Sequence, residues 1–253
     1  MVGGRVFIPS QTGTVYSLDA DTGCTRWGFQ AASGIRSGVT IGEANGTTAV
    51  FFSDGGATVY ALNAQTGELI WKVRPVEHYA RMITATPRYY KGVVYQPFAS
   101  FEEALGGDPK FQCCTFRGSV AALDAGTGKK LWHTFTIPES PKPTQKTPAG
   151  APQSGPSGAS VWSSPTIDEQ LGVLYVATGD NYSDPPTNTS DAILAMNLKT
   201  GELLWSRQLT GTDAFNTGCS TPGRKNCPDA GGPDFDFGQP PILVRLGEER
   251  GLW

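Results

Sequence analysis

The stretch VYALNAQTGELIW, residues 59–71, decides the fold because close copies of it recur along the chain. The other copies are VYSLDADTGCTRW at 15–27, VAALDAGTGKKLW at 120–132 and ILAMNLKTGELLW at 193–205. Each copy has a short strand of alternating apolar residues, then a Thr-Gly turn, then a Trp, which is typical of one repeated hairpin corner. The chain is therefore expected to consist of repeated units.

Further short strands lie between the copies, such as GRVFIPS, TAVFFSD, GVVYQPF and GVLYVATG, so each unit is expected to hold about four strands. Repeated four-stranded sheets predict an all-β fold, a β-propeller in which each repeat Trp is a wedge between neighbouring blades. A fifth unit begins at PILVRL, residues 241–246. We expect residues 1–253 to form a single, partial propeller domain of four to five blades.

The composition excludes several classes of function. The 253 residues include 32 glycines and 19 prolines, which indicates many tight turns. The net charge is -3 without a Lys/Arg cluster, so neither nucleic acid nor an anionic membrane is an expected partner. No apolar run approaches the roughly 18 residues of a membrane span. The opening MVGGRVFIPS is typical of a turn and a strand rather than a leader, so we expect either a fragment or a chain whose leader was removed.

The five cysteines include two adjacent ones, Cys113 and Cys114. Their Cα atoms are about 3.8 Å apart across a trans peptide, below the usual disulfide range of about 4.4 to 6.8 Å, so a strained ring, two reduced thiols and a structural clasp all stay open. Cys219 and Cys227 are expected to form a disulfide, which leaves Cys24 without a partner. If both cysteine pairs form disulfides, an oxidising compartment is predicted, and the protein is then expected to be periplasmic or secreted.

The unit LDAxTGxxxW resembles the tryptophan-docking repeat of the PQQ-dependent quinoprotein alcohol dehydrogenases, eight-bladed propellers that bind pyrroloquinoline quinone (PQQ) and calcium. The insertion around CCTFRGSV and the element GPDFDFG look most like the polyvinyl-alcohol dehydrogenase branch. The resemblance covers nearly the whole chain. It implies oxidation of alcohols, including bulky or polymeric secondary alcohols, to ketones or aldehydes by hydride transfer to PQQ. A non-catalytic scaffold propeller that binds proteins shares the repeat and is the alternative.

The segment ITATPRYYKGVVYQPFASFEEAL, residues 83–105, is similar to a family stretch that contacts both the quinone and the calcium ion. The resemblance implies that Thr84 touches PQQ and that Glu102 ligates the metal. Glu103 is the alternative ligand, because a one-residue bulge exchanges the two glutamates.

The segment GASVWSSPTIDEQLGVLYVATGDN, residues 158–181, resembles the blade that carries the floor under the quinone. The resemblance implies Trp162 as this floor, Ser160 near the quinone edge and Asp180 as a metal ligand. Methanol-type enzymes have Asn at the ligand position, so a carboxylate here makes the site more anionic; Asn181 is the alternative ligand. Calcium accepts either through oxygen.

The element GPDFDFGQPPIL, residues 232–243, is similar to the family stretch that holds the catalytic aspartate. The resemblance places the general base, which also faces the metal, on Asp234 and an accessory carboxylate on Asp236. GTDAFNTGC offers a rival alignment through Asp213 and Asn216.

The resemblance also answers why two cysteines are adjacent: it implies a disulfide ring of Cys113 and Cys114 as the roof over PQQ, opposite Trp162. Either Arg36 or Arg81 would neutralise the carboxylates of the cofactor. The sequence has no Cys-x-x-Cys-His haem motif, so the electrons are expected to leave to a separate acceptor such as a cytochrome c.

Overall fold

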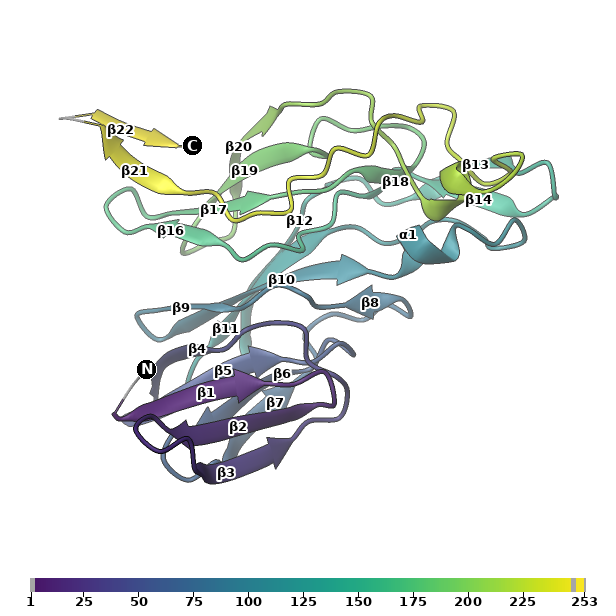
Figure 1. Ribbon diagram of the computed structural model, residues 1–253. Coiled ribbons are helices and arrows are strands. Elements are labelled where there is room, and N and C mark those ends of the chain that lie inside the picture. The colour runs from purple at the N-terminus through teal and green to yellow at the C-terminus, as the bar shows by residue number, and fades with distance from the viewer. Residues whose placement is uncertain (1–2, 247–248, 253) are drawn as a thin grey trace.

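The structure, a computed structural model, describes residues 3–246 and 249–252 and consists almost entirely of antiparallel β-sheet (Figure 1). The first sheet has three strands, fewer than the expected four: β1 (Arg5–Pro9), β2 (Thr14–Asp19) and β3 (Thr25–Gln30). The second sheet has four: β4 (Thr40–Ala44), β5 (Thr47–Ser53), β6 (Val59–Asn63) and β7 (Leu69–Val73).

The later sheets repeat this plan. The third contains β9 (Arg88–Tyr90), β10 (Val93–Ser100), β11 (Ser119–Asp124) and β12 (Lys130–Phe135), and β8 (Arg81–Met82) pairs with the end of β10. The fourth contains β16 (Thr166–Asp168), β17 (Val173–Ala177), β19 (Ala192–Asn197) and β20 (Leu203–Gln208). A hairpin of β21 (Leu243–Leu246) and β22 (Glu249–Leu252) follows, where the sequence predicts a fifth unit.

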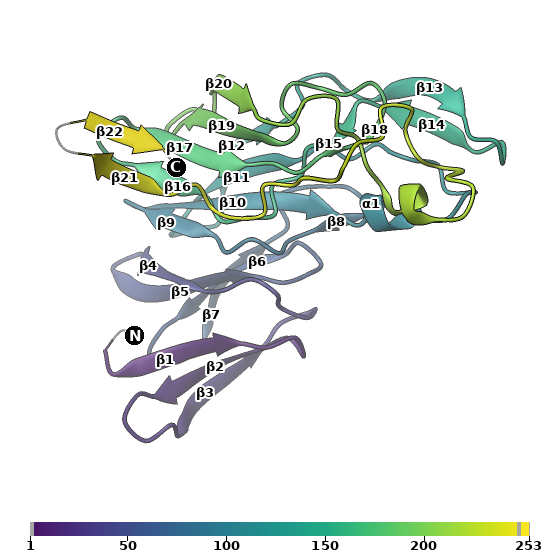
Figure 2. The ribbon, with the colours of Figure 1, turned by 45° about the horizontal axis from the view of Figure 1, so that its top comes forward.

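Successive sheets stack face to face, with the core in layers between them (Figure 2). In β5, Phe52 faces the first sheet and Phe51 faces the third, and both side chains are fully buried. In β11, Leu123 and Val120 divide in the same way between the layers on either side of the third sheet. The inner strands are buried on both faces, which explains why their sequences are almost continuously hydrophobic.

The four repeated hairpins explain how the sheets dock. In the second copy, the Asn63 side chain accepts hydrogen bonds from the N–H groups of Gln65 and Thr66, and Gly67 takes a φ of +79°. Trp27 of the preceding sheet lies against this glycine, at 2.7 Å from where a Cβ would be, and its Nε1 donates to the Ala64 carbonyl. Only glycine permits both the positive φ and this close approach.

The same docking joins the following sheets. Trp71 lies on Gly128 and donates to the Ala125 carbonyl at 2.8 Å, and Trp132 lies on Gly201. The prediction that the repeat tryptophans are wedges between blades is therefore confirmed for these three sheet pairs.

The insertions gather at one end of the stacked sheets, where Figures 1 and 2 show α1, β13, β14 and β18. They comprise α1 (Glu102–Leu105), β13 (Lys142–Lys146), β14 (Pro152–Gly155), β15 (Ser157–Gly158), β18 (Asn181–Ser183) and the 3-10 turn η1 (Thr217–Ser220). α1 contacts η1, and β15 pairs with β18. Helices of a single turn cannot cross a bilayer, and no longer helix occurs in the described ranges.

The cysteines pair as expected from the sequence. Cys113–Cys114 and Cys219–Cys227 are disulfides, and Cys24 is free and exposed. The peptide bond between Cys113 and Cys114 is cis.

Candidate active site

A cleft of about 590 Å³ opens where the insertions meet. Among the residues that line it are six assigned by the resemblance: Arg36, Thr84, Ser160, Trp162, Asp234 and Asp236. They come from four separate parts of the chain, so the fold brings together what the sequence keeps apart. Three further polar residues share the lining: Ser100, Glu103 and Tyr182.

Three carboxylates cluster at the cleft, where Asp234 and Asp236 belong to the lining and Asp180 is buried beside them. Asp180, Asp234 and Asp236 each offer an oxygen, and these oxygens all lie within 4.8 Å of one another. Asp180 is buried, and its Oδ2 has no hydrogen-bond partner within residues 3–246 and 249–252. A buried carboxylate oxygen that lacks a donor is costly unless the group is protonated or paired with a cation.

The backbone of the loop that precedes β21 fixes this cluster. Asp213, which is fully buried, accepts hydrogen bonds from the N–H groups of Asp234 and Phe235 at 3.4 and 3.3 Å. Asp234 has a φ of +63°, an uncommon conformation for a side-chain-bearing residue. Asp236 accepts from Trp162 Nε1 at 3.0 Å and from the Asp180 N–H at 2.8 Å. Asp213, the rival of Asp234 in the sequence, therefore holds the backbone that presents Asp234.

The electrostatics are those of crowded carboxylates, each of which raises the pKa of its neighbours. Burial, and then the charge of Asp236, raises the pKa of Asp180 well above its usual range. Burial and the charges of Asp236 and Asp234 raise the pKa of Glu103 to about 7. Burial also raises the pKa of Asp236, although its hydrogen bonds from Asp180 and Trp162 oppose the shift. A cation in the cleft would relieve this repulsion.

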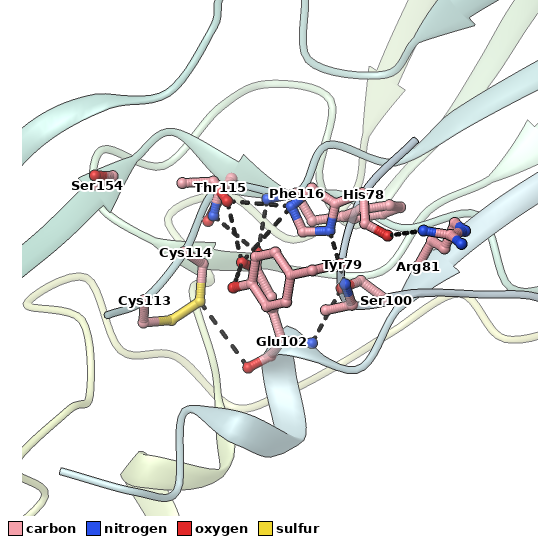
Figure 3. Close-up of polar contacts among 12 residues, drawn as sticks. His78, Tyr79, Arg81, Ser100, Glu102, Cys113, Cys114, Thr115, Phe116 and Ser154 are labelled. Carbon is pink, nitrogen blue, oxygen red and sulfur yellow. Dashed lines mark hydrogen bonds and ion pairs between the residues drawn. A yellow bond between two sulfur atoms is a disulfide. The ribbon is translucent and has the colours of Figure 1, made fainter. Parts of the chain in front are cut away.

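Glu102, assigned to the metal from the sequence, does not line the cleft. Its side chain is fully buried in the opposite direction, where Oε2 accepts from the N–H groups of Thr115 and Phe116 at 2.8 and 2.7 Å (Figure 3). The hydrogen-bond partners of the Glu102 carboxylate are therefore groups of the protein itself. The alternative residue, Glu103, lines the cleft instead, because α1 begins here and a helical turn points adjacent side chains about 100° apart.

The cysteine pair is also not on the wall of this cleft. Both cysteines are fully buried, and Cys113 Sγ lies 3.8 Å from the carbonyl oxygen of Tyr182. Tyr182 itself lines the cleft, and its hydroxyl hydrogen-bonds Ser160 Oγ at 2.5 Å. The disulfide therefore lies behind Tyr182, whereas the resemblance places it as a roof. Trp162 does present an exposed face, with 37% of its surface accessible.

The remaining alternatives are separated by their contacts. Arg36 lines the cleft, whereas Arg81 donates to the His78 carbonyl outside it. Asn181 is buried, donates to the Ser157 carbonyl and accepts from the Thr187 N–H. The Asn216 side chain is likewise committed, with hydrogen bonds to backbone groups of Tyr182, Asn226 and Gly218.

Sequence reasoning missed two residues. Tyr182 is two positions after Asp180, so an extended strand places both on one side, a signal that could have been used. Asp191 is fully buried, neither of its carboxylate oxygens is hydrogen-bonded to a described residue, and burial together with Asp213 and Asp236 raises its pKa to about 8. Nothing in the sequence around Asp191 indicates this environment.

Stacked sheets joined by Trp-on-Gly contacts, with an acidic cleft at one end, define a β-propeller of the quinoprotein type. Residues 1–223 match the PQQ family described as the glucose/ethanol/alcohol dehydrogenase β-propeller domain, and the chain belongs to this family. The family assignment and the all-β propeller expected from the repeats are thereby confirmed.

Relatives and solved structures agree with this family. The chain is 40% identical to a polyvinylalcohol dehydrogenase of a Pseudomonas species over 99% of its length, and 38% identical to that of Sphingopyxis sp. (strain 113P3) over 98%. It spans 39% of the length of each of these relatives. Its fold matches the quinohemoprotein alcohol dehydrogenase from Comamonas testosteroni with a TM-score of 0.71 and 22% identity, covering 100% of this chain and 38% of that one.

Proposed function

We propose that this chain is the cofactor-bearing part of a PQQ- and calcium-dependent alcohol dehydrogenase. The buried, unpaired oxygen of Asp180, beside Asp234 and Asp236, carries the proposal. A set of carboxylate oxygens suits a hard cation such as Ca²⁺. Asp180, Asp234, Asp236 and the adjacent Glu103 would hold the ion, and its charge would offset their mutual repulsion.

The remaining lining suits a flat, anionic quinone. The exposed face of Trp162 offers a stacking surface, Arg36 offers a positive charge, and the hydroxyls of Thr84 and Ser160 offer hydrogen bonds. When bound, PQQ would accept hydride from the carbinol carbon, and Ca²⁺ would act as a Lewis acid.

The residues of the chain would then handle the proton and the geometry. Asp234 is placed to take the hydroxyl proton of the alcohol as general base, because it lines the cleft and burial raises its pKa above that of an ordinary aspartate. Asp213 holds the backbone of Asp234 in place. Asp236 ties the Trp162 ring to the Asp180 backbone, so the stacking face and the carboxylates keep a fixed relation.

The substrate, acceptor and compartment complete the proposal. Relatives at 40% and 38% identity are named polyvinylalcohol dehydrogenases, which supports a polymeric or bulky secondary alcohol as substrate and a ketone as product. The electrons would pass to a separate acceptor such as a cytochrome c. Two disulfides support a periplasmic or secreted location.

The test is a calorimetric titration of PQQ into the full-length protein with and without Ca²⁺, followed by turnover of a secondary alcohol. We expect saturable, calcium-dependent binding that Asp180→Ala abolishes, and turnover that Asp234→Asn lowers by about 10² to 10⁴-fold. Asp21→Asn, at an exposed position, is the matched control and should change neither. A folded protein that binds no PQQ would instead favour the non-catalytic scaffold.

A further inference from the structure

Two adjacent glutamates of one helical turn point into different environments. Glu103 lines the acidic cleft, and Glu102 is fully buried behind it. Glu103 takes part in the carboxylate cluster of the cleft. Glu102 has no role in that cluster. A buried carboxylate requires donors, and the identity of those donors indicates what it does.

Four donors converge on Glu102 (Figure 3). Oε2 accepts from the N–H groups of Thr115 and Phe116, and Oε1 accepts from the hydroxyls of Tyr79 and Thr115. The Glu102 side chain is fully buried, whereas Tyr79 and Thr115 reach it from exposed positions, and hydrogen bonds to a carboxylate are among the stronger ones in proteins. Glu102 therefore fastens the start of α1 to the segment that follows the adjacent cysteines.

That segment reaches the other side of the cleft. Cys114 Sγ lies 4.0 Å from the Glu102 carbonyl oxygen, and Cys113 Sγ lies 3.8 Å from the Tyr182 carbonyl oxygen. Tyr182 lines the cleft and follows Asp180 by two residues in the chain. The Cys113–Cys114 disulfide thus lies between the backbone segment that carries Glu103 and the segment that carries Asp180.

We propose that Glu102 is a positioning residue: by clamping residues 115–116 it holds the Glu103 carboxylate at a fixed distance from Asp234 and Asp236, and so sets the cation affinity of the cleft. The proposal rests on the proposed calcium role of that cleft. Groups that orient metal ligands change metal affinity by about 10 to 100-fold when they are removed.

The experiment is a double-mutant cycle read by Ca²⁺ calorimetry on the full-length, metal-free protein. We expect Glu102→Gln to weaken Ca²⁺ binding about tenfold in the wild-type background, but by less than about twofold in the Glu103→Gln background. The exposed Glu43→Gln is the matched control and should leave affinity unchanged. Equal weakening in both backgrounds, or none, would overturn the proposal, because Glu102 would then not act through Glu103.

Two additions keep the outcome decisive. If Glu102→Gln does not fold, Tyr79→Phe and Thr115→Val each remove one hydroxyl donor to Oε1 and leave both backbone donors to Oε2. We expect each to weaken Ca²⁺ binding by a smaller factor, again only while Glu103 is present.

The second addition separates failure of the positioning role from failure of the calcium role. If the wild-type protein binds no Ca²⁺, the calcium role fails, and hydrogen exchange of the metal-free protein decides the positioning role. Faster exchange over residues 102–107 in Glu102→Gln, but not in Glu43→Gln, would support it. Unchanged protection of that segment would overturn it.

Discussion

The indole nitrogen of Trp162 donates a hydrogen bond to the carboxylate of Asp236 at 3.0 Å. Among the described residues, this bond connects the exposed aromatic face that lines the cleft with the acidic cluster. The same carboxylate accepts from the Asp180 N–H, so Asp236 has both oxygens engaged and is ordered before any ligand binds. Preorganisation of this kind lowers the cost of binding.

The first prediction concerns that hydrogen bond. Trp162→Phe keeps an aromatic face but removes the donor that lowers the pKa of Asp236. The pKa should therefore rise, and Ca²⁺ affinity at pH 7 should fall by about tenfold, the equivalent of one hydrogen bond to a charged group. Calorimetry of Trp162→Phe measures this, with the exposed Trp205→Phe as the control. Unchanged affinity would show that the indole bond does not support the carboxylates.

The second prediction follows from Asp191, whose buried carboxyl has a pKa raised to about 8. A raised pKa means that the folded protein favours the protonated form, so the stability this group contributes is fully present below the unfolded pKa of about 4, is lost between about pH 4 and pH 8, and changes little above that. Without metal, the free energy of unfolding should be lower at pH 9 than at pH 5. Asp191→Asn should remove about 4 kcal/mol of this loss between pH 5 and pH 9, because asparagine stays neutral and tolerates the φ of +47°.

Urea unfolding of the metal-free protein at pH 5, 7 and 9 tests this. The stability of the wild type should fall relative to that of Asp191→Asn between pH 5 and pH 8, with most of the difference already present at pH 7, and the two profiles should run parallel above pH 8. Asp21→Asn, at an exposed position, should follow the wild type at every pH. Parallel pH profiles for the wild type and Asp191→Asn between pH 5 and pH 8 would contradict a high pKa at Asp191.

The blades were predictable from the sequence because the residues that shape each hairpin lie close together in the chain. The Asn63 side chain, the Gly67 turn and the docking Trp all lie within or beside one hairpin, so the pattern can be read without knowing the tertiary structure. The first sheet was less predictable. Its number of strands depends on which other segments pair with β1, and the repeat does not encode that pairing.

The candidate site was predictable only in part. Asp180, Asp234 and Trp162 stand in segments whose resemblance specifies a position, and the fold brings them together. The choice between Glu102 and Glu103 depends on how one helical turn is rotated, which counting residues cannot determine. The burial of the adjacent cysteines depends on the long insertions that surround them, and sequence alone does not place those.

The third prediction concerns the Cys219–Cys227 disulfide. It closes a loop of nine residues, so in the chain-entropy account its removal should cost about 2.5 kcal/mol. Urea unfolding of the double variant Cys219→Ala/Cys227→Ala measures the loss. Cys24→Ala removes a free, exposed thiol and should leave stability unchanged. If the double variant were as stable as the wild type, the disulfide would not restrain the unfolded chain.

The last prediction separates two requirements at the docking glycines, a positive φ and close contact with a Trp ring. Gly46 and Gly128 have nearly equal φ values of +74° and +72°, but a Cβ on Gly46 would meet nothing within 4 Å, whereas one on Gly128 would lie 2.7 Å from the Trp71 ring. Gly46→Ala should therefore cost only the backbone strain of about 1 to 2 kcal/mol. Gly128→Ala should cost a further 1 to 3 kcal/mol or so, because Trp71 must shift. Urea unfolding of both variants isolates the docking contact by difference, and equal losses would mean that the Trp71 ring moves aside freely and does not hold the two sheets together.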